Sequence, residues 1–136
     1  MRLEITRRSD LATRALLALA AAGERTKASV LAEAVGTTPG FLSQAMTPLV
    51  AQGWVRSEPG PTGGYTVLVD PATVSVLEVI EAVEGATDTG RCVLEDRPCA
   101  GGGTCALHRP WTSAREHLLA ELAATPLASL TLRPPS

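Results

Sequence analysis

The residues with the clearest capacity for chemistry are three cysteines and a histidine in the second half of the chain. Cys92, Cys99 and Cys105 are the three cysteines of the 136-residue sequence, and His108 follows three positions after the last of them. Thiolates and imidazole nitrogens bind metals, and thiols can also be oxidised. Because an odd number of cysteines fits poorly with a closed framework of disulfides, the group indicates metal or redox chemistry in a reducing compartment.

The spacing of these residues favours one kind of metal site. Zinc ligands usually lie about two to four residues apart in tight knuckles, whereas this loop reads C-x6-C-x5-C-x2-H and contains no CxxC pair. The glycines at 101–103 give the backbone freedom to fold around a larger group such as an iron–sulfur cluster. A zinc site and three thiols without a metal remain alternatives. A third alternative is a thiol sensor in which Cys99 and Cys105 form a reversible disulfide.

The elements that position this loop begin with a pattern typical of a helix-turn-helix. Ser9 or Asp10 can cap a first helix that runs to about Ala22, and a second, short helix is expected over 27–35. Gly36 then suits the C-terminal stop of that second helix.

A third helix is expected directly after this stop. Thr38 suits its N-cap and Pro39 its first position. Two short helices joined by a glycine-containing turn are the pattern of a helix-turn-helix. Because Pro48 removes a backbone hydrogen bond inside the third helix, we predict a kink between Gln44 and Pro48 and a less regular C-terminal half.

The pattern after the third helix changes from helical to alternating. Strands are expected over 54–57 and 65–69, and the intervening residues EPGPTGG are rich in turn formers. A β-hairpin in this place is a wing. Its tip contains Gly63 and Gly64, which allow a close approach to a phosphate backbone or a minor groove.

The second half of the chain combines helical segments with a long irregular one. Ser75 and Glu78 form a capping box for a helix that ends at Gly85, and the segment 86–104 has no helical or strand period. Pro110 restarts a helix that ends before Pro126. The apolar stripe of this last helix comprises Trp111, Ala114 or Arg115, Leu118, Leu119 and Leu122.

A fold class and a domain plan follow from these elements. We expect a mostly α-helical protein with a small β-hairpin wing, in which a winged helix-turn-helix is followed by a long C-terminal dimerisation helix. The expected parts are a DNA-binding domain over 1–85, a cysteine loop over 86–108, and a dimerisation helix with a C-terminal turn over 109–130. The leucine-lined helix has little of its own chain to pack on, which favours a homodimer.

Charge supports a nucleic-acid partner for the first part of the chain. Seven of the twelve Lys and Arg residues lie within 1–56, whereas ten of the fourteen Asp and Glu residues follow that segment. The N-terminal part can therefore face a polyanion although the formal net charge is −2. An uneven surface charge with no nucleic-acid partner is the alternative.

Other function classes are less well supported by the sequence. The longest apolar run, residues 15–22, has eight residues, too few to span a bilayer, and the N-terminus lacks the apolar region of a secretory signal. No nucleophile elbow, P-loop or dinucleotide-binding glycine motif is present. We therefore expect a cytoplasmic protein without a membrane partner that is neither an enzyme nor an electron carrier built on the cluster.

Candidate contacts to double-stranded DNA lie on the third helix, on the wing and among the basic residues near them. The third helix offers small and polar side chains for base or phosphate contacts, and the basic residues can neutralise phosphate charge. These candidates are Arg7, Arg8, Lys27, Thr38, Pro39, Gly40, Ser43, Gln44, Arg56, Pro61, Thr62 and Gly63.

Five segments together resemble the Rrf-type family of bacterial regulators: SDLATRALLAL, ASVLAEAVGTTPGFLSQAMTPLVAQGWVRS, GPTGGYTV, SVLEVIEAVEG and CALHRPW. They cover nearly the whole chain, and the wing and the cysteine loop are the most specific parts. The resemblance implies a homodimeric winged-helix protein that binds a DNA operator. It also implies that the cysteine loop holds a 2Fe-2S or 4Fe-4S cluster, whose gain, loss or redox change alters operator affinity.

The resemblance also supplies candidate ligands. Cys92, Cys99 and Cys105 match the three cysteine ligands of the family. His108 matches the histidine that completes the site in IscR-like members, although the first cysteine gap is one residue longer here. Asp10 matches the aspartate that NsrR-like members contribute from the other subunit, and it can also serve the first turn of its helix. The fourth ligand therefore stays open between His108 and Asp10.

Overall fold

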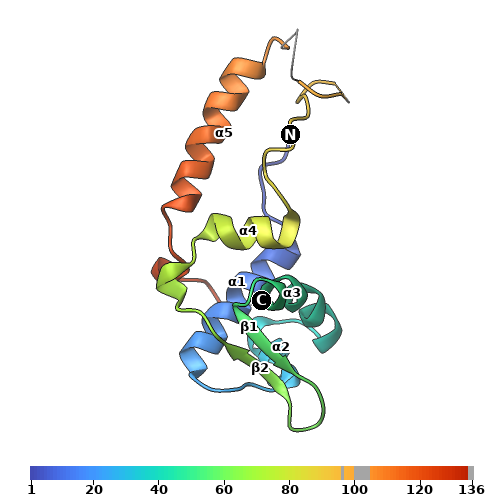
Figure 1. The fold of residues 1–136 in the computed structure, drawn as a ribbon, viewed down its shortest axis with the longest axis vertical. Helices are drawn as coiled ribbons and strands as arrows, with labels where there is room; N and C mark the ends of the chain where they lie inside the picture. The colour runs from blue at the N-terminus through green and yellow to red at the C-terminus, as the bar shows by residue number, and fades with distance from the viewer. Residues whose placement is uncertain (96, 100–104, 135–136) are drawn as a thin grey trace.

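The computed structural model describes residues 1–95, 97–99 and 105–134 (Figure 1). The glycines at 101–103, which we expected to loosen the cysteine loop, lie outside these residues. The elements in chain order are α1 (Arg7–Ala22), α2 (Ala28–Val35), α3 (Pro39–Ala51), β1 (Val55–Glu58), β2 (Gly64–Val67), the 3-10 turn η1 (Pro71–Thr73), α4 (Val76–Glu84), α5 (His108–Ala123) and the 3-10 turn η2 (Leu127–Ser129). The predicted fold class, mostly helical with one small hairpin, is confirmed.

The first helix begins earlier than predicted. The side chain of Thr6 accepts a hydrogen bond from the backbone N–H of Ser9, so Thr6 is the N-cap and Ser9 and Asp10 lie inside the first turn. The prediction of Ser9 or Asp10 as the cap is therefore wrong, because a capping residue that lies farther upstream starts the helix. The C-terminal end is as expected, since Gly23 adopts a left-handed conformation and donates its N–H to Leu19.

The turn between α2 and α3 is confirmed in detail. Gly36 ends α2 in a left-handed conformation with a φ of 78°. The side chain of Thr38 accepts from the N–H of Phe41, and Pro39 occupies the first position of α3. These local signals place α3 directly after a tight turn, as a helix-turn-helix requires.

Helix α3 remains helical on both sides of Pro48. It runs from Pro39 to Ala51, so the predicted less regular C-terminal half is wrong. Pro48 lies within the last turn, where only one internal hydrogen bond is lost. The N–H of Gln52 still donates to the carbonyl of Pro48 at 3.1 Å, and the Thr47 hydroxyl donates to the carbonyl of Ser43 at 2.9 Å.

The wing is a two-stranded antiparallel hairpin that is fastened to the helical body. Its register pairs Val55 with Val67 and Glu58 with Gly64. The backbone N–H and C=O of Tyr65 both bond to those of Thr26, each at 2.9 Å. Gly64 has a φ of +145°, and a Cβ there would lie 2.3 Å from the carbonyl oxygen of Thr26. This fastening therefore requires glycine at position 64.

The predicted capping box on α4 is also present. The Ser75 side chain accepts from the N–H of Glu78 at 3.1 Å, and the Glu78 carboxylate accepts from the N–H of Ser75 at 2.7 Å. Helix α5 begins at His108, two residues before the predicted start at Pro110. His108 is therefore the first residue of a helix.

The core surrounds α1 at one end of the molecule. Leu16, Leu42 and Val79, from α1, α3 and α4, are buried together. Figure 1 shows α4 lying across this body and α5 extending away from it beside the cysteine segment. No residue of α5, all of which is described, is buried. No helix in the described part of the chain is both long and apolar enough to cross a membrane.

After α5 the chain returns to the core, which the sequence analysis did not anticipate. Leu127 is fully buried, and its N–H donates to the carbonyl of Val74 at 2.9 Å. The N–H of Val76 donates to the carbonyl of Thr125 at 2.9 Å. Both ends of the α4–α5 unit are thereby anchored beside α1.

Candidate metal centre and nucleic-acid interface

The three cysteines meet at the far end of the molecule. Their Sγ atoms all lie within 4.8 Å of one another, and each residue is partly buried. The N–H of Cys92 donates to the carbonyl of Arg97 at 2.8 Å, and the N–H of Cys99 donates to the carbonyl of Gly90 at 3.0 Å. These bonds fold the segment back on itself without regular strands. Cys92 and Cys99, which are distant in the loop, are thereby brought to the same side.

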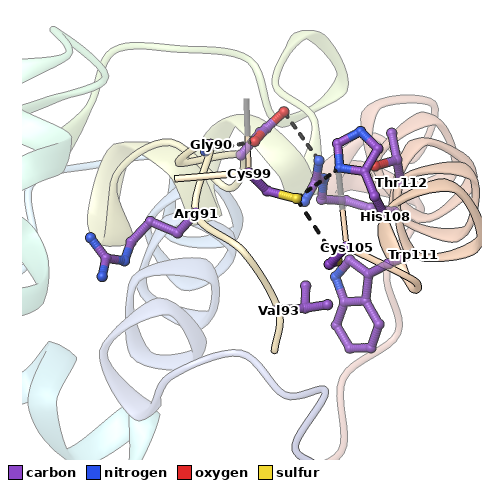
Figure 2. Close-up of a pocket in the computed structure, with 10 residues that line it drawn as sticks. Gly90, Arg91, Val93, Cys99, Cys105, His108, Trp111 and Thr112 are labelled. Atoms are coloured by element: carbon purple, nitrogen blue, oxygen red, sulfur yellow. Dashed lines mark hydrogen bonds and ion pairs between the residues drawn. The ribbon is translucent and has the colours of Figure 1, made fainter. Parts of the chain in front are cut away.

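Cys105 and His108 complete the group from the start of α5. The N–H of His108 donates to the carbonyl of Cys105 at 3.1 Å, so the two residues flank the turn that leads into the helix. The His108 Nδ1 atom lies 3.2 Å from the Sγ of Cys99, and the Sγ atoms of Cys99 and Cys105 are 3.8 Å apart. Figure 2 shows Cys99, Cys105, His108 and Trp111 around one pocket. Its volume is about 140 Å³.

The thiols differ in their electrostatic surroundings. The backbone N–H of Leu94 donates to the Cys92 Sγ at 3.4 Å, and this bond, with one from Glu95, lowers the pKa of Cys92 below the ordinary thiol value. Desolvation raises the pKa of Cys105, and its hydrogen bond to Cys92 adds to this shift. The Cys92 thiol therefore loses its proton more readily than an ordinary thiol, and the thiolate is the form that binds metals.

The chemistry of the donors fits an iron–sulfur cluster. Three sulfurs and one imidazole nitrogen form a soft donor set, and such sets select iron–sulfur clusters or zinc over the harder divalent cations. The backbone bonds that fold the loop fix Cys92 and Cys99, and the turn that leads into α5 fixes Cys105 and His108. The donors therefore come from two segments that fold toward each other.

Asp10, the other candidate for the fourth ligand, lies elsewhere in the chain. Its carboxylate pairs with the guanidinium of Arg14 at 3.0 Å and with that of Arg7 at 3.3 Å, all on α1. Asp10 does not line the pocket beside the thiols. Within one copy of the described chain, the structure brings His108 and not Asp10 to the cysteines.

Sequence reasoning missed two charged residues at this pocket. Asp88 and Arg115 both line it, and they form an ion pair at 3.3 Å. Arg115 lies seven residues after His108 and four after Trp111, so helical spacing places the three on one face of α5. That spacing is visible in the sequence, but the sequence analysis placed position 115 in the apolar stripe of the last helix. The partner Asp88 has no local signal, because it lies 27 residues away.

The first half of α3 presents its candidate DNA-contact residues to solvent. Thr38, Pro39, Gly40, Ser43 and Gln44 are all exposed. The opposite face is buried in the core, so the exposed side is available to a groove of DNA.

Phe41 lies among these candidates and was not predicted. Its side chain is 62% exposed in the first turn of α3. The signal that could have found it was its place outside the buried stripe of the helix, which contains Leu42, Ala45, Met46 and Leu49. An apolar side chain of this kind can contact a thymine methyl group.

The candidate basic residues are distributed over three places. Arg7 is exposed, and besides Asp10 it bonds the carbonyl of Gly36 at 3.3 Å. Arg8 donates to the carbonyl of Val83 at 2.9 Å, which ties α1 to the end of α4. Lys27 is exposed and lines a hollow beneath the wing. Arg7 and Arg8 therefore have structural partners, whereas Lys27 faces a surface hollow.

The wing residues lie around the hairpin tip. Arg56 pairs with Glu58 at 3.3 Å, and Pro61 and Thr62 are exposed at the tip. Gly63 is buried, and a Cβ there would lie 2.0 Å from the carbonyl oxygen of Glu58. The small size of Gly63 is thus needed inside the hairpin itself.

Comparisons with known proteins agree with this fold. Residues 5–133 match the Rrf2 family, described as an iron-dependent transcriptional regulator. The chain is 31% identical over 133 residues to ORF2 of Azotobacter vinelandii, assigned to the HTH-type transcriptional regulators, with 96% of this chain and 80% of ORF2 covered. It is 35% identical over 88 residues to the HTH-type transcriptional regulator IscR of Klebsiella pneumoniae, with 65% of this chain and 53% of IscR covered. The chain thus spans about half the length of that relative.

A solved structure shows the same fold. IscR of T. potens superposes with a TM-score of 0.72 and 20% identity, covering 93% of this chain and 84% of that one. The named relatives are transcriptional regulators and not enzymes, as the sequence analysis expected. With a family match over nearly its whole length, a helix-turn-helix and a hairpin wing, the chain belongs to the Rrf2 family of transcriptional regulators.

Proposed function

We propose that this protein is a DNA-binding transcriptional regulator whose operator affinity is controlled by an iron–sulfur cluster held by Cys92, Cys99, Cys105 and His108. The observation that carries the proposal is the meeting of three Sγ atoms within 4.8 Å, with the His108 Nδ1 atom 3.2 Å from one of them. The family description as iron-dependent supports iron as the metal. When bound, the cluster supplies a centre that can be lost, rebuilt or reduced.

The DNA-binding part of the proposal rests on α3 and the wing. The exposed first half of α3 would enter the major groove, and the wing would contact the adjacent backbone. A homodimer would present two such helices to the two halves of a double-stranded operator, and α5 is the helix we assign to the dimer interface. A regulator of this kind acts where the chromosome lies, in the cytoplasm.

The residues of the chain offer a continuous route from the cysteines to the helix-turn-helix. Cys105 and His108 flank the turn that leads into α5, and α5 packs on α4. The last turn of α4 binds α1, because Val83 accepts from Arg8, and the Glu84 carboxylate accepts from the hydroxyl of Ser9. Ordering of the loop would therefore set the position of α5, and with it the spacing of two recognition helices in a dimer.

The proposal is tested by anaerobic purification followed by absorbance, iron and sulfide analysis. The wild type should show visible absorbance with iron and sulfide. The triple variant with Cys92, Cys99 and Cys105 changed to Ala should show none. Operator binding, on duplexes selected from a random library by the wild type, should then differ between the loaded and cluster-free protein. Equal affinity in both states would refute control by the cluster.

The fourth ligand is tested by a matched pair of variants. His108→Ala should lose the cluster, or lose it faster on exposure to air, whereas Asp10→Ala should retain it. The placement of Asp10 between Arg7 and Arg14 supports this assignment. The reverse outcome, with loss only in Asp10→Ala, would assign the ligand to Asp10 of the second subunit.

One observation favours a second candidate function, a cluster-free regulator that senses oxidation through its thiols. The Sγ atoms of Cys99 and Cys105 are 3.8 Å apart, close enough to join after a small movement. A hydroperoxide would accept two electrons and two protons from the two thiols as the disulfide forms and water and an alcohol are released. Colourless protein that gains a Cys99–Cys105 disulfide, detected by mass spectrometry, would support this candidate.

A further inference from the structure

Three charged residues that are not proposed ligands, Asp88, Arg91 and Arg115, line the pocket beside the thiols. His108, Trp111 and Arg115 lie at helical spacing on one face of α5, and all three line this pocket. Figure 2 labels His108 and Trp111 there. The long side chain of Arg115 is only 21% exposed. By comparison, the side chains of Arg25 and Arg56 in ion pairs of the wing are 47% and 58% exposed. Arg115 is therefore sheltered on the side of the cysteines.

The partner of Arg115 holds it there without cancelling its charge. Asp88 pairs with the guanidinium at 3.3 Å, and it belongs to the segment that leads into the cysteine loop. The side chain of Asp88 is 57% exposed, so solvent screens its negative charge more than it screens the sheltered guanidinium. The guanidinium of Arg115 is therefore the member of the pair that solvent screens less.

We propose that Arg115 is a positioning residue of the metal centre, whose charge offsets that of the thiolates and raises the reduction potential of the cluster. This inference rests on the proposed function. Three thiolate ligands and the sulfides of a cluster carry negative charge, and reduction adds one more electron. A nearby cation favours that step electrostatically. In the test the electron comes from dithionite, and Arg115 keeps its proton because guanidinium does not titrate in this range.

The structure also assigns a fastening role to the same pair. Asp88 precedes Cys92 by four residues, and Arg115 lies two turns into α5. Their ion pair joins the segment that leads into the cysteine loop to the helix that begins at His108, at the edge of the pocket. Loss of either side chain would remove this ion pair. Only a change of charge would shift the reduction potential of the cluster in a direction set by the sign of that charge.

The experiment measures the midpoint potential of the loaded protein by anaerobic spectroelectrochemistry. We expect Arg115→Gln to move the potential to more negative values and Arg115→Lys to stay near the wild type. Asp88→Asn should move it to more positive values, because it removes a negative charge while the stem of Arg115 stays packed on α5. The matched control is Arg25→Gln, which removes an arginine from an ion pair with Glu58 on the wing. Circular dichroism checks that all variants are folded.

Three outcomes would overturn this inference alone. An Arg115→Gln potential equal to that of the Arg25→Gln control, or a wild-type cluster that dithionite does not reduce, shows that Arg115 does not tune the centre. Shifts of the same sign in Arg115→Gln and Asp88→Asn show that the pair acts only through the fold. These results leave the proposed function intact. Wild-type protein without visible absorbance, iron and sulfide overturns the proposed function and this inference together.

Discussion

The cysteine thiols are chemically unequal although they lie in one group. Cys92 accepts a backbone hydrogen bond from Leu94, which stabilises its thiolate. Cys105 is desolvated, and burial of this kind disfavours a charge. Two thiols within 4.8 Å of each other therefore have pKa values shifted in opposite directions.

This difference predicts the order in which the metal-free protein reacts with iodoacetamide as the pH rises. Because only the thiolate reacts, the lowered pKa of Cys92 makes it reactive at a lower pH than an ordinary thiol. The raised pKa of Cys105 delays its reaction to a higher pH. Peptide mass spectrometry after timed labelling at a series of pH values measures both midpoints. A midpoint for Cys105 at or below that of Cys92 would contradict the assignment.

Gly64 combines two requirements for glycine in the wing, a positive φ and a close approach to another backbone segment. Its φ of +145° disfavours a side chain, and a Cβ would meet the carbonyl of Thr26 at 2.3 Å. Gly60 has a φ of +95°, but a Cβ there would have nothing within 4 Å. Gly60 therefore has an unfavourable φ alone for a side chain, whereas Gly64 has an unfavourable φ and a steric contact.

We predict that Gly64→Ala lowers the free energy of unfolding more than Gly60→Ala does. Strain alone costs on the order of 1–3 kcal/mol at such positions. The contact with Thr26 adds to it at Gly64, so that variant should also lose the bonds between Tyr65 and Thr26. Urea denaturation compares the two variants, and amide hydrogen exchange at Thr26 and Tyr65 reports on the fastening. Equal losses of stability would show that the close approach is easily relieved.

At the scale of elements, α4 is the helix that joins the two ends of the molecule. Its start is fixed by the capping box of Ser75 and Glu78, and its end by Arg8 and Ser9 of α1. Val79 and Val83 are buried on the inner face of α4. This helix therefore has defined contacts at both termini and along its length.

Removal of the cap should have a measurable cost. Ser75→Ala loses the side-chain acceptor for the N–H of Glu78, and the expected loss is about 1 kcal/mol in the free energy of unfolding. Glu78→Gln is the matched control, because a glutamine oxygen can still accept from the N–H of Ser75. Urea unfolding followed by circular dichroism measures both. A larger loss in Glu78→Gln than in Ser75→Ala would contradict the role assigned to the hydroxyl.

At the scale of the whole molecule, α5 and the N-terminal segment form an exposed apolar groove. Its volume is about 490 Å³, and its lining includes Leu3, Ile5, Leu118 and Leu122. Leu3 is 72% exposed and Leu118 is 44% exposed. Apolar surface of this kind is typical of interfaces, and a second copy of the chain would cover it in the proposed homodimer.

We predict that Leu118→Glu shifts the protein from dimer to monomer. A carboxylate in this groove would be desolvated by the second copy, which costs free energy of association. His117→Glu introduces the same residue at the neighbouring position, which is exposed and does not line the groove, so it should remain dimeric. Light scattering after size-exclusion chromatography gives the mass of each. A wild-type protein that is monomeric at all concentrations would show that α5 does not form a dimer interface.

The parts of the fold that follow from local chemistry were predictable. Thr38 with Pro39 and Ser75 with Glu78 act within four residues of each other, so the sequence carries the whole signal. The less regular C-terminal half of α3 was predicted from a rule for helix interiors, but Pro48 lies in the last turn and α3 is helical to Ala51.

The parts that depend on distant pairing were not predictable. The bond of Ser9 to Glu84 and that of Arg8 to Val83 each join residues 75 positions apart, and neither has a local pattern. In the candidate site, Cys105 and His108 are only three positions apart, so their closeness follows from the chain itself. The ion pair of Asp88 with Arg115 depends on how the loop meets α5, which no spacing rule describes.

The positions of the two tryptophans give the protein a built-in optical readout. Trp111 lines the pocket beside the thiols, whereas Trp54 lies at the base of the wing, where its carbonyl accepts from Leu68 at 2.8 Å. A coloured centre quenches the fluorescence of an adjacent indole by energy transfer, and this effect falls steeply with distance. In a Trp54→Phe protein the remaining emission would follow the occupancy of the metal centre. In a Trp111→Phe protein the emission of Trp54 would report on changes at the wing when DNA binds.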